Sequence, residues 1–291
     1  MRNKELIANV PSISCVENYF LGWCAEHGIS EKILFGKSFV PADEVFTDFL
    51  IGNTRFESYD RIPRIMDIAE ENGVIGRFAA NELGFTAIDR NINNDNLVLI
   101  EVGERFFEDI AVKPWRDDHF IWLTEKRGEE YRYLNNYPLS EGQLNTRQVI
   151  EIYGNKMLLY FKKNEDKARA DEIKQYTECQ LQQIMCRQNF AFEMPYEYEP
   201  IALRNAVGII KIIRLRLAKW LAAIGLYESA CFLDRYFLEL SRFYVSLEAA
   251  ILRERFDASK ADEIVKIILD REKELSINIK ADSNERNFEK D

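Results

Sequence analysis

The chain has 291 residues, of which 47% are hydrophobic and 30% charged, and its formal net charge is −10. This length is enough for one large domain or two modest ones, each with a core of its own. The negative charge argues against a general nucleic-acid partner, because phosphate binding requires clustered Lys and Arg side chains. Chemistry that needs an imidazole must use His27 or His119, the two histidines of the chain.

The amino terminus and the apolar segments indicate a cytoplasmic protein. Residues 1–10 lack the long apolar region and the small-residue cleavage site of a secretory signal. The nearest candidate for a membrane span, residues 206–226, carries four basic side chains and is not expected to cross a bilayer. Five cysteines without a C-x-x-C pair argue against a disulfide framework and a zinc ribbon, and we expect at least four of them to be buried, reduced thiols.

The first half of the chain predicts short helices followed by strands. Helices are expected over residues 15–26, over a short segment capped by Ser30, and over residues 59–71. Strands are expected over residues 84–88, 97–102, 119–125, 131–134 and 157–161. Residues 126–129 predict a hairpin turn, and a short helix from Thr146 to the stop at Gly154 precedes the last strand.

The second half predicts an almost wholly helical structure from about residue 164. Helices are expected over residues 166–189, 201–224, 226–256 and 259–275. The polar segment that follows predicts disorder. We therefore expect a first domain over residues 1–163, a helical domain over 164–275 and a disordered tail over 276–291.

Cys15 stands at the start of the first predicted helix, and His119 at the start of a predicted strand. The N–H groups and dipole of a helix start stabilise a thiolate, and a nearby imidazolium lowers the pKa of a thiol further. The two residues therefore predict a cysteine nucleophile with a histidine base. The alternatives are a packing role for Cys15 and, for His119, a bond to Asp117 or Asp118 at a surface turn. Strand alternation allows His119 to face either side of the sheet.

The flanking residues resemble those of the C39 peptidase branch of the papain-like superfamily, over about residues 5–163. In that family a Gln of the oxyanion hole precedes the cysteine by six residues, where this chain has Asn9. An Asp follows the histidine by sixteen residues, where this chain has Asn135, with Asn136 adjacent. The stretch from Cys15 to the F-G of K-I-L-F-G also resembles the amino-terminal domain of butirosin-pathway acyltransferases.

The resemblance implies an α+β, papain-like (C39-type) cysteine peptidase fold with a helical carboxy-terminal extension. It implies that Cys15 is the nucleophile, that His119 is its base, that Asn135 orients the imidazole and that Asn9 helps to hold the oxyanion. The implied reaction is acyl transfer from a thioester to an amine in a specialised-metabolite pathway for a peptide-like antibiotic. The implied partners are an acyl or peptidyl carrier protein, which presents the acyl group on a phosphopantetheine arm, and a small-molecule amine.

Two other functions remain open on the same residues. A cysteine peptidase or amidase would pass the acyl group to water, and a catalytically degenerate member would bind a peptide or metabolite without reaction. No metal site and no nucleotide-binding motif is expected from the spacing of the residues. His27, beside Gly28 at a helix end, is expected to be structural, because a helix C-terminus favours an imidazole.

Two features of the second half allow both a structural and a functional interpretation. The predicted helix over residues 201–224 combines an apolar face with basic side chains on the other face: Lys211, Arg214, Arg216 and Lys219. It is either an amphipathic helix of a bundle, a docking face for an acidic partner or a membrane-surface helix. The aromatic segment 190–200 is either a packing strap between helices or a loop that covers a substrate slot near Cys15.

Overall fold

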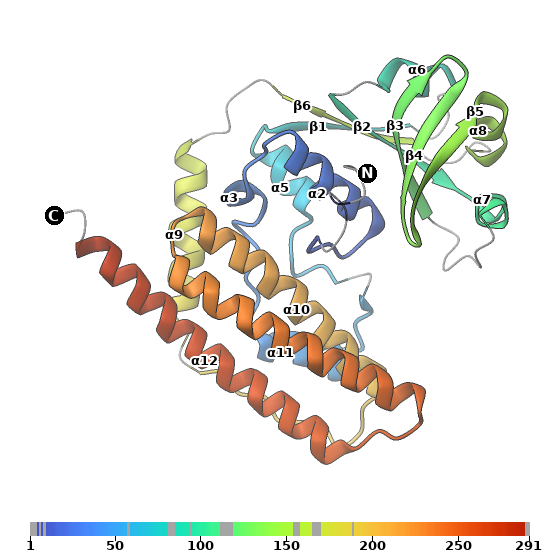
Figure 1. The fold of residues 1–291 in the computed structure, drawn as a ribbon. Coiled ribbons are helices and arrows are strands. Elements are labelled where there is room, and N and C mark those ends of the chain that lie inside the picture. Colours follow the sequence, from blue (N-terminus) through green and yellow to red (C-terminus); the bar gives the residue numbers. More distant parts are fainter. Residues whose placement is uncertain are drawn as a thin grey trace. The chain divides into compact units, whose positions relative to one another are not determined.

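The computed structural model divides the chain into two compact units (Figure 1). Unit 1 consists of residues 1–30 and 69–169, and unit 2 of residues 31–68 and 170–291. The structure describes residues 5, 7, 10–56, 59–80, 85–92, 95–110, 119–153, 158–164, 170–187 and 189–288. The expected assignment of residues 31–68 to the first domain is wrong, because this segment belongs to the helical unit.

Within the described residues, unit 1 has one antiparallel sheet of six strands in the order β1-β6-β2-β3-β4-β5. The strands are β1 (Ile75–Ala80), β2 (Asn96–Val102), β3 (His119–Arg127), β4 (Glu130–Asn136), β5 (Leu139–Asn145) and β6 (Leu158–Lys163). The predicted hairpin between β3 and β4 is confirmed, and its turn contains Gly128 at φ +62°, a conformation that favours glycine. The register pairs His119, the first residue of β3, with Val102, the last residue of β2.

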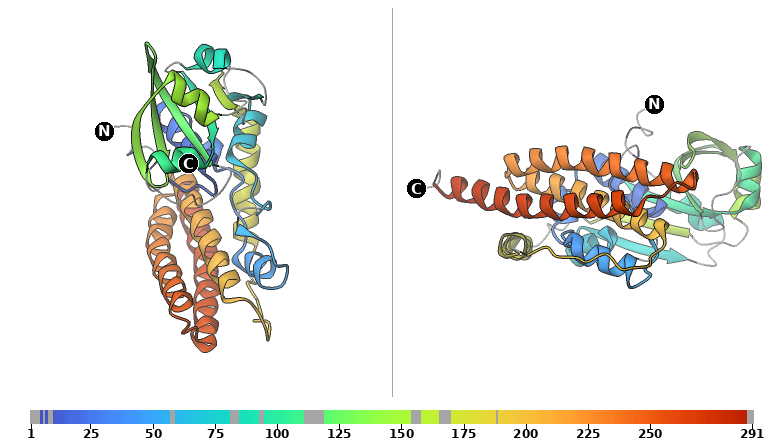
Figure 2. Two further views of the ribbon diagram at one scale, coloured as in Figure 1. Left: turned by 90° about the vertical axis from the view of Figure 1, so that its right-hand side faces the viewer. Right: turned by 90° about the horizontal axis from the view of Figure 1, so that it is seen from below.

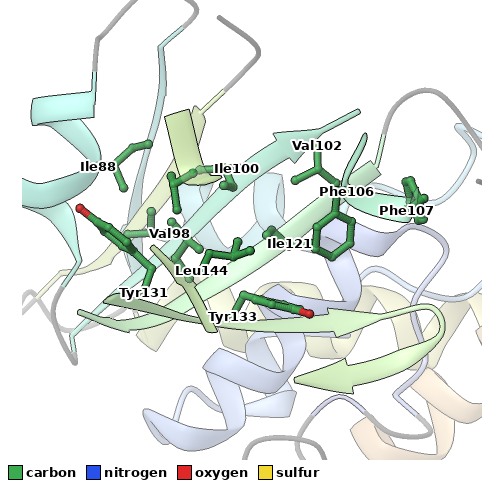
Figure 3. Packing of buried hydrophobic residues seen from close by; sticks show 12 residues of the cluster. Ile88, Val98, Ile100, Val102, Phe106, Phe107, Ile121, Tyr131, Tyr133 and Leu144 are labelled. Atoms are coloured by element: carbon green, nitrogen blue, oxygen red, sulfur yellow. The ribbon is translucent and has the colours of Figure 1, made fainter. Parts of the chain in front are cut away.

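Three short helices cover one face of this sheet: α6 (Phe85–Asn91), α7 (Glu104–Asp109) and α8 (Thr146–Tyr153). Alternate side chains of β2, β3 and β4 point to this face and form one apolar cluster with the three helices, as Figure 3 shows. The cluster contains Ile88, Val98, Ile100, Val102, Phe106, Phe107, Ile121, Leu123, Tyr131, Tyr133, Leu144 and Val149.

The helix that carries Cys15, α2 (Cys15–Glu26), packs on the opposite face of the sheet. Its bounds are those expected from the sequence, and it contacts β2, β3 and β4. The rings of Phe20 on α2 and Phe161 on β6 lie 5.2 Å apart between centroids. Phe161 pairs with Leu97, and the side chain of Leu97 points to the face opposite Val98 and the apolar cluster. The contact with Phe161 therefore places α2 on that opposite face.

The predicted strand over residues 84–88 is wrong, because residues 85–91 form the helix α6. Ile88 and Ile92 lie one helical turn apart and both contact the apolar cluster, so the apolar spacing fits a helix rather than a strand. The helix expected over residues 59–71 is also shorter: α5 is Ile65–Glu71. It follows Pro63, whose ring and missing N–H are unfavourable inside a helix.

Unit 2 is helical. Its elements are α3 (Glu31–Leu34), α4 (Ala42–Leu50), α9 (Ala170–Cys186), α10 (Pro200–Ala223), α11 (Tyr227–Leu252) and α12 (Ala258–Phe288), together with the first residues of α5. Helices α10, α11 and α12 run side by side (Figure 2). Helix α4 buries Val45, Phe46 and Phe49 and packs against α10, which explains why residues 31–68 belong to this unit.

The expected disordered tail is wrong for residues 276–288, which continue α12; residues 289–291 lie outside the described part of the chain. Ser276 is 7% exposed, and its hydroxyl donates to the carbonyl of Ile184 at 2.8 Å. Ile279 is fully buried, and the Asp282 carboxylate accepts from the Ser229 hydroxyl at 2.8 Å. These contacts explain why a segment of polar composition is helical.

The buried side chains of α10 favour the bundle interpretation of this helix over a docking face for an acidic partner. Arg214 and Arg216 are both 0% exposed, and Lys219 forms an ion pair with Glu31 at 2.8 Å. Lys211 lies 4.7 Å above the ring of Tyr244 on the neighbouring helix α11. Both the apolar and the basic side chains of α10 therefore pack against other parts of unit 2. Among the described helices, none combines the length and the apolar character that a membrane span requires.

A buried ion pair joins α10 to α12. The Arg214 guanidinium donates to both carboxylate oxygens of Glu272 and to the Val40 carbonyl at 2.9 Å, and both charged side chains are 0% exposed. Removal of one partner leaves a buried charge without compensation, which costs about 3–5 kcal/mol. We therefore expect Glu272→Ala to lower the free energy of unfolding by about this amount in urea denaturation followed by far-UV circular dichroism.

The matched control for this substitution is Glu274→Ala. Glu274 pairs with Arg271 on the same helix at 2.7 Å, with 48% of its side chain exposed. Exposed pairs contribute at most about 1 kcal/mol, so this variant should unfold close to the wild-type midpoint. Equal effects of the two substitutions would contradict a special role of the buried pair.

Candidate active site

The start of α2 is fixed by reciprocal capping around Cys15. The Ser14 hydroxyl accepts from the Glu17 N–H at 3.2 Å, and the buried Glu17 carboxylate accepts from the Ile13 N–H at 2.7 Å. This S-x-x-E arrangement makes Cys15 the first residue of the helix, with a half-buried side chain. The N–H groups of this first turn point away from the helix, so they favour negative charge beside Cys15.

The structure brings His119 and Asn135 into direct contact. His119 Nε2 and Asn135 Oδ1 are 2.6 Å apart, and Asn135 is 0% exposed. The Asn135 amide nitrogen donates to the carbonyls of Tyr137 and Pro138, at 3.1 and 3.0 Å. Because carbonyls only accept hydrogen bonds, they fix the amide orientation and leave Oδ1 facing the imidazole.

This orientation determines the tautomer of neutral His119. The acceptor Oδ1 of Asn135 requires a proton on Nε2, so the lone pair of the neutral ring is on Nδ1. The imidazole contacts the buried ring of Phe107 on α7, with 5.2 Å between the ring centroids and 56° between the ring planes. His119 therefore presents a basic nitrogen while its other nitrogen and its plane are held in place.

Tyr19 connects α2 to the same end of the sheet. Its buried hydroxyl accepts from the Asn136 N–H at 2.9 Å and lies 2.9 Å from the Phe120 carbonyl. Side chains of a helix lean toward its N-terminus, so this hydroxyl lies beside the turn that Cys15 begins. Burial raises the pKa of Tyr19 far above its ordinary value, and the nearby Cys15 charge raises it further.

These contacts locate the expected site residues relative to one another. Phe120 follows His119 and Asn136 follows Asn135, so α2 meets β3 and β4 at the residues next to the histidine–amide pair. Asn135, rather than Asn136, bonds His119. The side chain of His119 is on the face of Ile121, since its ring contacts Phe107 of the apolar cluster.

Three other expectations concern residues at or near this site. Asn9, the expected oxyanion ligand, lies outside the described residues, as do Asp117 and Asp118. His27 lies at the end of α2, as expected, and its Nδ1 lies 2.9 Å from the Trp23 carbonyl, a contact compatible with a structural role.

The thiols differ from the expectation that at least four of them are buried. Only Cys24 among the five is buried; Cys15 is half-buried, and Cys179, Cys186 and Cys231 are exposed, all as free cysteines. Cys179 and Cys186 are on α9, and Cys231 is on α11.

The aromatic segment 190–200 packs within unit 2. The rings of Phe192 and Phe46 lie 5.5 Å apart, and those of Tyr198 and Phe256 lie 6.1 Å apart. Tyr196 is 99% exposed. These contacts fit the interpretation as a packing strap.

The sequence matches no known family model and no curated protein. Among the described residues, no group of three or more His, Cys, Asp or Glu side chains could hold a metal ion. The chemistry of the site is therefore inferred from its geometry. Two parts of that geometry were not identified from the sequence: Tyr19, and the cap that Ser14 and Glu17 form at the start of α2.

The two histidines should have opposite tautomers in their neutral forms. His119 bonds an acceptor through Nε2, whereas His27 bonds the Trp23 carbonyl through Nδ1. We expect ¹⁵N NMR of histidine-labelled protein to show an unprotonated Nδ1 for His119 and an unprotonated Nε2 for His27.

Two variants complete this measurement. His27→Gln assigns the resonances, and Asn135→Ala should remove the Nε2–H preference of His119 while His27 stays unchanged. Persistence of the same His119 tautomer in Asn135→Ala would show that the amide does not control it.

Proposed function

We propose that the protein is a papain-like cysteine enzyme of the C39 and butirosin type that transfers an acyl group through Cys15. The observation that carries this proposal is the bond between His119 Nε2 and Asn135 Oδ1. It leaves Nδ1 as a base at the end of the sheet that the Cys15 helix contacts through Tyr19. A thiol at a helix start is activated as a nucleophile by an oriented imidazole within its reach. Because the His119 side chain is on the sheet face opposite α2, the proposal requires its ring to reach Cys15 around the end of the sheet where β3 begins.

In the proposed reaction, His119 Nδ1 takes the proton of the Cys15 thiol. The thiolate attacks the carbonyl carbon of a thioester, and the oxyanion that forms is stabilised by N–H groups at the start of α2, with Asn9 as the expected second donor. Collapse of this intermediate breaks the thioester C–S bond, and the leaving thiolate takes the proton from His119. The products of this half-reaction are acyl-Cys15 and a free thiol.

The second half-reaction forms the amide. An amine attacks the acyl-Cys15 carbonyl while His119 accepts the amine proton. The C–S bond to Cys15 then breaks, and the proton on His119 returns to the Cys15 sulfur. In this proposal the acyl group arrives on the phosphopantetheine arm of a carrier protein in a cytoplasmic specialised-metabolite pathway, and the enzyme needs no cofactor of its own.

A peptidase or amidase would use the same four residues with water as the second nucleophile. The geometry of His119 and Asn135 supports both reactions equally, and the resemblance to the butirosin-type domains favours the amine. The buried amide that holds the imidazole is costly to retain in a protein that only binds a ligand, because each of its polar groups must be satisfied. This argues for an enzyme over a degenerate binding protein.

Acylation of Cys15 tests the proposal. The protein is incubated with N-acetylcysteamine thioesters of varied acyl chains and analysed by intact mass and peptide mapping. We expect one acyl group on Cys15, discharged to an amide by an added amine. Cys15→Ala should gain no adduct, and His119→Ala should be acylated about 10²–10⁴-fold more slowly, since a general base contributes that factor.

The exposed thiols require a matched background, because they can exchange with a thioester without catalysis. Replacement of Cys179, Cys186 and Cys231 by Ser removes them together and should leave acylation of Cys15 unchanged. An adduct that water discharges at a rate independent of the amine would favour the hydrolase. Equal acylation of wild type and His119→Ala would exclude the proposed mechanism.

A further inference from the structure

The Tyr19 hydroxyl lies between β3 and β4, two residues beyond the last residues that pair. The pairing of β3 with β4 ends at Trp122 and Leu134, and its continuation by two residues would place Phe120 opposite Asn136. Instead, the Tyr19 hydroxyl lies between them, 2.9 Å from the Phe120 carbonyl and 2.9 Å from the Asn136 nitrogen. A side chain of α2 therefore bridges the ends of two strands.

The bridge is adjacent to the proposed base and its orienting amide. His119 and Asn135 each immediately precede a residue that the hydroxyl contacts. The separation of the strand ends determines whether His119 Nε2 and Asn135 Oδ1 stay at 2.6 Å. The hydroxyl contacts both strands and so links their ends.

Tyr19 is also part of the helix that carries the proposed nucleophile. Tyr19 lies four residues after Cys15, one turn along the same face of α2. Its ring is 0% exposed and its hydroxyl also lies 3.1 Å from the Asn136 side-chain oxygen. A buried hydroxyl with partners on two strands allows the helix start little freedom to shift along the sheet.

The protonation state of Tyr19 suits this role. Burial raises the pKa of its phenol far above the ordinary value, and the Cys15 charge acts in the same direction. The phenol therefore stays neutral throughout the working range of a cysteine enzyme, and it can donate to the Phe120 carbonyl while it accepts from the Asn136 N–H.

We propose that Tyr19 is a positioning residue that holds Cys15 and the His119–Asn135 pair in register, by bridging the helix of the nucleophile to the strands of the base and its orienting amide. This inference rests on the proposed function, since it assigns a role in the activation of Cys15. Tyr19 acts through its neighbours and takes no part in the bonds that form or break.

The test is the pH dependence of Cys15 alkylation by iodoacetamide, quantified by peptide mass spectrometry in the Cys179→Ser, Cys186→Ser, Cys231→Ser background. An isolated thiol reacts with a midpoint at a pH of about 8.5. We expect wild-type Cys15 to react with a lower midpoint that depends on His119. Tyr19→Phe, which removes only the hydroxyl, should raise this midpoint by about one pH unit, a tenfold loss of thiolate at a fixed acidic pH.

The matched control is Tyr131→Phe. Tyr131 is also a fully buried tyrosine of unit 1, and its hydroxyl bonds Asp89 away from His119. Loss of this hydroxyl should lower the melting temperature without moving the Cys15 midpoint. The proposal is overturned if Tyr19→Phe and Tyr131→Phe give the same midpoint as wild type, because a purely structural hydroxyl would affect only stability.

Failure of the proposed function has a different signature. If His119→Ala leaves the wild-type midpoint unchanged, His119 does not activate Cys15, and the role of Tyr19 is rejected together with the enzyme mechanism. If His119→Ala raises the midpoint and Tyr19→Phe does not, the mechanism stands and the positioning role alone is rejected.

A second variant keeps the test decisive if Tyr19→Phe does not fold. Asn136→Ala removes a side-chain partner of the hydroxyl and retains the Asn136 N–H. It should raise the Cys15 midpoint in the same direction by a smaller amount. An unchanged midpoint in Asn136→Ala, together with an unfolded Tyr19→Phe protein, would assign Tyr19 to stability alone.

Discussion

The hydrogen-bond requirements of one buried amide organise the candidate site. A fully buried Asn side chain loses its water, so its two N–H groups and its oxygen need partners within the protein. The amide nitrogen of Asn135 donates to the carbonyls of Tyr137 and Pro138, so the amide oxygen faces His119. The turn between β4 and β5 thus controls, through Asn135, which nitrogen of the imidazole carries the proton.

The sequence predicted the elements of this site whose signals are local. The helix over residues 15–26 has a clear start and stop, and β3 and β4 are strands joined by a glycine turn. The offset between His119 and Asn135 identified the bonded pair, although Asn136 could not be excluded without the register of the strands. Tyr19 was not identified, because its role depends on two strands more than a hundred residues away.

The errors have physical causes that can be named. The β-branched side chains of Thr86 and Ile88 alternate in a way typical of a strand. The segment nevertheless forms a helix, because this places Ile88 in the apolar cluster. Arg214 reads as a surface charge in the sequence, and only the position of Glu272, 58 residues later, makes its burial possible. Hydrophobic periodicity describes only neighbours within a few residues, so it cannot predict a partner this far along the chain.

The course of the chain has a consequence for how this protein could be inherited. The polypeptide passes between the units at residues 30–31, 68–69 and 169–170, so unit 1 is not one continuous stretch of the chain. A gene fragment that ends near residue 163 would encode α4 without α10, and would leave the apolar face of Phe46 and Phe49 uncovered. The cysteine-bearing unit is therefore not a module that recombination could transfer alone, and the helical unit must be inherited with it.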